Sequence, residues 1–117
     1  MIYLLTILID PPKIIAQPSN MTIIEGNKFT LKCIGMSLPL FNVSWYKSSE
    51  LMTFIPNTYN DTGDGIRIAS LNIASANITD EGFYRCKLNN LLGSVNSKAI
   101  WINIQCKYDF YKFLKLM

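Results

Sequence analysis

The chain has 117 residues, of which 50% are hydrophobic and 16% are charged, and its formal net charge is +3. This length suits one domain with its own core, and a weak positive charge without a basic stripe gives little support to nucleic-acid binding. The chain contains no histidine. A His-dependent catalytic triad is therefore excluded, and the commonest general base and zinc ligand are missing.

Residues 1–10 form an apolar N-terminal segment that ends at Asp10. A membrane-spanning helix needs about 20 apolar residues, so the segment is too short, and a membrane anchor is expected only in regions outside this chain. The segment also lacks the basic start and the small-residue cleavage site of a secretory signal. A truncated signal, an extra N-terminal strand and a sequence artefact all stay open as readings.

The folded domain is expected to begin at Pro11, because the residue before each proline is biased to extended geometry. Lys13–Ile15 and Met21–Ile24 flank a polar stretch that contains Pro18. This arrangement predicts a first strand that is split at the proline and crosses between two sheets. After a turn at Glu25–Asn27 the pattern alternates strictly, which predicts a half-buried strand. Its predicted core residues are Phe29, Leu31 and Cys33.

The middle of the chain gives one clear strand and one weak region. Val43 and Trp45 are predicted to point into the core, with Ser44 and Tyr46 on the opposite face. From Ser48 to Gly65 the alternation weakens, so this span is predicted to hold a short edge strand, at the apolar patch Leu51–Ile55, and loops.

The second half of the chain contains the next predicted strands. Ile66, Ile68, Leu71 and Ile73 predict a strand with an irregularity between Ile68 and Leu71. Beyond Ala76 a further strand has an apolar phase, and Asn89–Gly93 predicts a hairpin turn. A last strand is predicted to end by Gln105, and no segment has the period of a helix. The inward residues of these two strands are Tyr84, Cys86 and Leu88, then Ile100, Ile102 and Ile104.

One motif gives the chain a family resemblance. Asp80-x-Gly82-x-Tyr84-x-Cys86 follows Leu31-x-Cys33, Trp45-Tyr46-Lys47 and Leu71-x-Ile73, and it precedes Asn90-x-x-Gly93. This order resembles the intermediate (I-set) branch of the immunoglobulin superfamily over residues 12–105. The resemblance implies an all-β, Greek-key sandwich of two antiparallel sheets over residues 11–105, with a C-terminal tail at 106–117.

The resemblance also implies structural roles for the signature residues. Cys33 and Cys86 would form a disulfide between the sheets, Trp45 would pack on it, and the Tyr84 hydroxyl would bond to backbone at the corner near Asp80. Leu71 and Gly82 complete the signature, whereas Leu88 stands where the family usually has a small residue. Cys106 is left over, as an unpaired thiol or a cysteine that pairs outside this domain.

Four Asn-x-Ser/Thr sequons occur, and all of them are predicted to be accessible. Asn20 and Asn60 are expected in loops, Asn77 at the corner, and Asn42 on the outward phase of its strand. Use of any of these sites would require the secretory pathway.

No residue pattern predicts a cofactor, a metal site or a catalytic centre. Asn60–Gly65 has the oxygen-bearing side chains of a calcium loop, but its twelfth position is Leu71, where such a loop needs a bidentate glutamate. A polar turn is the better interpretation. Asp80 is expected to cap or pair locally, with Arg67 as one partner, because it has no second matched carboxylate for acid/base catalysis.

Two surface features are candidates for protein binding. Leu91 and Leu92 fall at a hairpin tip, where one of them either folds back onto the edge of the core or both serve as an apolar anchor. Tyr46, Arg85 and Lys87 are predicted on the outward face of the sheet that contains Trp45. Tyrosine and arginine are favoured at interface hot spots, so this face is the preferred binding face.

The resemblance implies an extracellular recognition module of a cell-adhesion or receptor-type protein, bound to a protein ligand or to a second immunoglobulin domain. The alternative is an intracellular spacer of the giant muscle-protein type, which would be cytoplasmic or sarcomeric. An enzyme is disfavoured by the missing histidine and nucleophile motifs. The sequons and the apolar start favour the extracellular reading.

Overall fold

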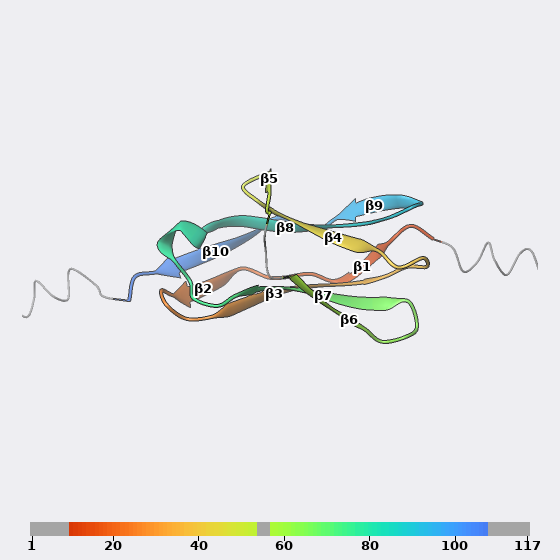
Figure 1. Cartoon of the computed structure of the whole chain (residues 1–117). Coiled ribbons are helices and arrows are strands. Elements are labelled where there is room, and N and C mark those ends of the chain that lie inside the picture. Colours follow the sequence, from red (N-terminus) through yellow and green to blue (C-terminus); the bar gives the residue numbers. More distant parts are fainter. Residues whose placement is uncertain (1–9, 54–56, 108–117) are drawn as a thin grey trace, which may run out of the picture.

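The computed structural model describes residues 10–53 and 57–107, which form a sandwich of two β-sheets (Figure 1). One sheet has four strands in the order β1-β3-β7-β6 and is antiparallel throughout. These strands are β1 (Lys13–Ala16), β3 (Phe29–Met36), β6 (Asn57–Asp61) and β7 (Ile66–Ile73). The all-β sandwich expected from the sequence is confirmed.

The second sheet has six strands in the order β2-β10-β8-β4-β5, with β9 also paired to β8. Its strands are β2 (Met21–Ile24), β4 (Asn42–Lys47), β5 (Glu50–Leu51), β8 (Gly82–Asn90), β9 (Gly93–Asn96) and β10 (Ile100–Gln105). All its pairings are antiparallel except that of β2 with β10, which is parallel. We call the surface of this sheet that faces away from the core the outer face.

The split first strand is confirmed. β1 pairs with β3 in one sheet and β2 pairs with β10 in the other, so the chain changes sheets between Ala16 and Met21. The Gln17 side chain fixes this crossing by accepting a hydrogen bond from the Lys98 backbone N–H at 3.2 Å. The described chain enters at one end of the sandwich and leaves at the other (Figure 1).

The core forms where the apolar phases of the two sheets face each other, as the alternation in β3, β4, β8 and β10 predicts. Its buried hydrophobic residues include Phe29, Leu31, Cys33, Phe41, Trp45, Leu71, Tyr84, Cys86, Leu88 and Ile102. Cys33 and Cys86 are joined by a disulfide across the sheets, as the family resemblance implied. Among the described residues no helix is long and apolar enough to cross a membrane.

Leu88 is accommodated by a glycine on the facing sheet. Leu88 is fully buried, and a Cβ atom added at Gly35 would lie 2.4 Å from Leu88 Cδ2 and 2.9 Å from Phe41 Cε1. Atoms of these types cannot approach so closely without a shift of the neighbours. The large residue at position 88 therefore depends on the missing side chain at position 35.

Two details of the strand prediction are wrong. β7 pairs with β3 without a register shift from Ile66 to Ile73, so no irregularity separates Ile68 from Leu71. Ala69 and Leu71 are the buried residues, whereas Ile66 and Ile68 belong to the outward phase and stay half-buried. The weak span from Ser48 to Gly65 contains two edge strands, β5 and β6, and residues 54–56 of the apolar patch lie outside the described residues.

The corner before β8 is built as the resemblance implied. The Tyr84 hydroxyl donates a hydrogen bond to the Asp80 carbonyl oxygen. Asn77 caps a single 3₁₀ turn, η1 (Ile78–Asp80), in a reciprocal capping box in which the Asp80 carboxylate accepts the Asn77 backbone N–H at 2.7 Å. The expected cap at Asp80 is thus confirmed.

Arg67 does not pair with Asp80. Its guanidinium lies on the edge of the other sheet, where it binds both carboxylate oxygens of Asp61 at 2.6 and 2.9 Å. The hydrogen bond from Arg67 lowers the pKa of Asp61. The two residues face each other because the β6–β7 ladder pairs them directly.

Candidate functional site

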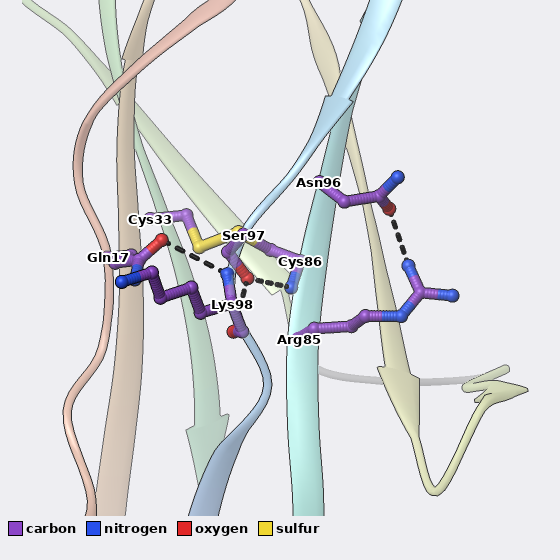
Figure 2. Close-up of a disulfide and its surroundings, with 7 residues drawn as sticks. All are labelled: Gln17, Cys33, Arg85, Cys86, Asn96, Ser97 and Lys98. Atoms are coloured by element: carbon purple, nitrogen blue, oxygen red, sulfur yellow. Dashed lines mark hydrogen bonds between the residues drawn. A yellow bond between two sulfur atoms is a disulfide. The ribbon is translucent and has the colours of Figure 1, made fainter.

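The outer face of the six-stranded sheet carries residues that the core does not need. Inward residues alternate with outward ones along β8, so Arg85 and Cys86 point to opposite sides of the strand. Figure 2 shows Arg85 on the side of β8 away from the disulfide, directed toward Asn96. The outward position that the sequence predicted for Arg85 is therefore confirmed.

Arg85 is held between two strands by a ring and an amide. It lies directly opposite Tyr46 on β4, with its guanidinium carbon 4.0 Å from the centroid of the Tyr46 ring. Its Nη1 donates to Asn96 Oδ1 at 2.5 Å. Among the described residues these are the interactions of the Arg85 side chain, which leaves Nε and Nη2 available as donors. The ring and the amide thus hold the guanidinium in place on the outer face.

Two aromatic residues beside Arg85 were missed by the sequence analysis. Phe83 lies two positions before Arg85 on the same face of β8 and pairs in register with Trp101 on β10. Their ring centroids are 4.8 Å apart in an edge-to-face arrangement, and 53% of Phe83 is exposed. The available signal was the phase of each strand, because both aromatics occupy positions where the alternation calls for a polar residue. We call Tyr46, Phe83, Arg85 and Trp101 the outer-face cluster.

A shallow groove runs along part of the outer-face cluster. Tyr46, Phe83 and Arg85 line it together with Ser48, Ser49 and Ala99. At its margin Leu51 of β5 lies opposite Tyr46 and is 56% exposed. Apolar rings, one cation and exposed hydroxyl groups thus lie side by side across β5, β4 and β8. This is the mixture of an apolar centre and polar margin that protein interfaces use.

The structure separates the other predicted binding residues from this groove. Lys87 is on the outer face, opposite Ser44, but lies one pleat further along β8 than Arg85. Leu91 and Leu92 form the turn between β8 and β9, and both are exposed, Leu91 at 93%. Neither leucine folds back onto the core edge. Six residues of strand separate Leu91 from Arg85, which is about 20 Å, so the turn is a distinct surface.

All four sequon asparagines are exposed. Asn20 lies just before β2, Asn42 is the first residue of β4, and Asn77 caps η1. Asn60 lies on the edge strand β6 and not in a loop, which corrects the prediction for this residue. The error arose because polar Asn57–Asp61 has no apolar phase, although its backbone still pairs with β7.

The remaining candidates are structural. The Asn60–Gly65 stretch closes the β6–β7 hairpin through a hydrogen bond from Thr62 Oγ1 to Asp64, with Gly63 and Gly65 at positive φ. Within residues 10–53 and 57–107 no group of three or more acidic, cysteine or histidine side chains is placed to hold a metal ion. Cys106 is exposed and, among the described residues, is a free cysteine, whereas Cys33 and Cys86 are paired.

Comparison with known proteins supports the same architecture. A model of the family described as immunoglobulin domain matches residues 11–90. The chain resembles the crystal structure of the N-terminal eight Ig domains of DSCAM with a TM-score of 0.74 at 24% identity, covering 82% of this chain and 13% of that one. It resembles a titin M10–obscurin-like 1 Ig complex with a TM-score of 0.72 at 23% identity, covering 86% of this chain and 98% of the other.

The curated relatives fall into two kinds of protein. The chain is 35% identical to the muscle M-line assembly protein unc-89 of Caenorhabditis elegans over 64% of its own length and 1% of the relative. It is 28% identical to the cell adhesion molecule Dscam1 of Drosophila melanogaster over 90% of its length and 5% of the relative. It is 30% identical to the human netrin receptor DCC over 81% of its length and 6% of the relative. The chain thus spans a small fraction of each relative.

Proposed function

We propose that this chain, which belongs to the immunoglobulin domain family, is a non-catalytic extracellular module that binds a partner protein through the groove lined by Tyr46, Phe83 and Arg85. Residues 11–105 are the binding domain in this proposal, and we assign it to the I-set branch. The observation that carries the proposal is the cation-on-ring pair of Arg85 and Tyr46 beside exposed Phe83. These side chains lie outside the buried core, and together they place aromatic surface and a cation on one face of the sheet.

The chemistry of the groove suggests the partner surface. Arg85 has free donors in a fixed plane, which suits a carboxylate acceptor. Phe83, two positions away on β8, and Leu51, on β5 beyond Tyr46, offer apolar area nearby. The expected partner is therefore a protein that presents an Asp or Glu flanked by apolar side chains. Both a different protein and a second immunoglobulin domain can present such a carboxylate.

Two features support an extracellular location. The Cys33–Cys86 disulfide is of the kind that persists in oxidising compartments. The sequons are all exposed, so glycans at Asn20, Asn42, Asn60 and Asn77 would need no rearrangement of the core. The similarity to proteins named as a cell adhesion molecule and a netrin receptor supports the same location.

The second candidate is an intracellular spacer module. It is favoured by the 35% identity to a muscle M-line assembly protein. A solved relative of this class contains the titin Z1Z2 domains in complex with telethonin, so protein binding belongs to both candidates. The two differ in whether the disulfide and the sequons are used.

The recognition proposal is tested with the secreted chain displayed as a fluorescent tetramer and incubated with a panel of live cells. We expect saturable binding to some of the cells. Arg85→Ala should weaken that binding by about 30-fold, because truncation of a central arginine hot spot costs about 2 kcal/mol. Tyr46→Ala should act in the same direction, since it removes the ring on which the guanidinium is stacked.

Lys32→Ala is the matched control. Lys32 is an exposed cation on β3, on the outward side of the four-stranded sheet. Its loss removes the same charge from a face that takes no part in the proposed binding. Equal weakening by Lys32→Ala and Arg85→Ala would mean non-specific charge attraction. Binding that survives Arg85→Ala and Tyr46→Ala would place the interface elsewhere.

A further inference from the structure

Asn20 is tied to the aromatic pair of the outer face. It lies immediately before β2, is exposed, and accepts a hydrogen bond from the Trp101 backbone N–H through its side-chain Oδ1 at 2.8 Å. The parallel ladder of β2 and β10 begins at the next residue, where Met21 pairs with Ile102. The Asn20 side chain therefore extends the ladder by one step, and this bond fixes the amide beside Trp101.

The hydrogen bond made by the Asn20 side chain is compatible with glycosylation of its amide nitrogen. Asn20-Met21-Thr22 is a sequon, and an N-linked glycan is attached to the amide nitrogen while Oδ1 remains a carbonyl oxygen. The Trp101 hydrogen bond uses Oδ1 alone. Among the described residues the amide nitrogen of Asn20 donates to no other group, so the sugar would replace no contact within the domain.

Trp101 provides an apolar platform next to this amide. Ile100 and Ile102 on either side of it are buried in the core, so the indole lies on the outward phase of β10 and packs against Phe83. The face of an aromatic ring carries partial negative charge and attracts the polarised C–H groups of a pyranose ring. A sugar attached at Asn20 is held near these rings at high effective concentration, so even a weak contact is populated.

We propose that Asn20 carries an N-linked glycan whose first sugars pack over the Trp101 indole. The carbohydrate then shields the β10 side of the outer face and limits partner contact to the groove beside Tyr46. β4 lies two strands away from β10, about 10 Å, which leaves that side open. This inference rests on the secretory location put forward above.

The test compares the secreted wild-type chain with Thr22→Val, which destroys the sequon but leaves Asn20 and its hydrogen bond in place. Peptide mapping by mass spectrometry reads the occupancy of each sequon. Acrylamide quenching of tryptophan fluorescence reads the packing, because Trp45 is fully buried and Trp101 is the partly exposed indole. We expect a glycan at Asn20 and a larger quenching constant in Thr22→Val. Ser44→Ala, which destroys the Asn42 sequon on the same sheet, should leave the quenching constant unchanged.

Distinct results overturn this inference and the broader proposal. If other sequons are occupied and Asn20 is not, the inference fails while the secretory location stands. If Asn20 is occupied and Thr22→Val does not change the quenching, the glycan does not cover Trp101. A secreted, folded chain without any glycan would contradict both the inference and the glycoprotein assignment.

Discussion

At the scale of single residues, the buried signature positions are explained by the contacts they make across the sandwich. Tyr84 is buried and its hydroxyl has one acceptor, the Asp80 carbonyl oxygen. Burial, and to a smaller extent the nearby Asp80 carboxylate, raise the pKa of Tyr84 to about 12. The neutral phenol is thus the form that the folded state requires.

Tyr84→Phe should lower the free energy of unfolding by about 1 kcal/mol, because the buried acceptor loses its donor. The pKa of this phenol rises from 10.0 to about 12 on folding, so its contribution is intact below pH 10 and is lost as the pH rises toward 12. Urea titrations at pH 8 and at alkaline pH check both effects. The account of the corner is wrong if the variant keeps the wild-type midpoint at pH 8, or if it loses as much stability as wild type above pH 10.

Gly35→Ala should destabilise the domain by about 1–3 kcal/mol through overpacking against Leu88. Leu88→Ala alone should cost about 2–5 kcal/mol because it leaves a cavity. In the double variant the clash with Leu88 is removed and only the clash with Phe41 remains, so its total cost should fall short of the sum by about 0.5–3 kcal/mol. A double-mutant cycle from urea melts measures this coupling, and strict additivity would show that the two positions do not compete for space.

At the scale of elements, the strands with a full apolar phase could be predicted and the others could not. Alternation located β3, β4, β8 and β10, because each buries every second residue in the common core. β6 and β9 were missed since their backbones pair while the side chains of Thr58–Asp61 in β6 and most of those in β9 stay outside the core. Phe83 and Trp101 were overlooked for a related reason, as each sits on the solvent phase of a strand recognised by its inward residues.

Substitution in the β8–β9 turn should affect partner binding less than substitution in the groove. Leu92→Asp should change the free energy of unfolding by less than about 0.5 kcal/mol, because the side chain is exposed at a turn. A standard interface covers about 800 Å² on each partner, enough to reach from the groove to the turn, where it would be peripheral. We therefore expect Leu92→Asp to weaken tetramer binding to cells less than Tyr46→Ala does. A larger effect at Leu92 would make the turn the centre of the interface.

At the scale of the whole molecule, the fold follows from the signature residues, and the compartment does not. Cys33, Trp45 and Cys86 meet in one buried layer between the sheets, an arrangement that the immunoglobulin domain family shares. Adhesion molecules and muscle proteins both appear among the relatives, so the shared fold does not decide between the two compartments. The described chain enters and leaves at opposite ends of the sandwich (Figure 1). What separates the candidate functions is therefore surface chemistry and cysteine redox state.

The most direct test of the extracellular assignment is a thiol-trapping and glycopeptide map of the protein isolated from its own tissue. Free thiols are alkylated at the moment of lysis, and peptides are then identified without reduction. The account predicts a Cys33–Cys86 disulfide with Cys106 outside it, together with glycan on at least one sequon asparagine. Alkylated Cys33 and Cys86 in a protein without glycan would contradict it and would support the intracellular spacer.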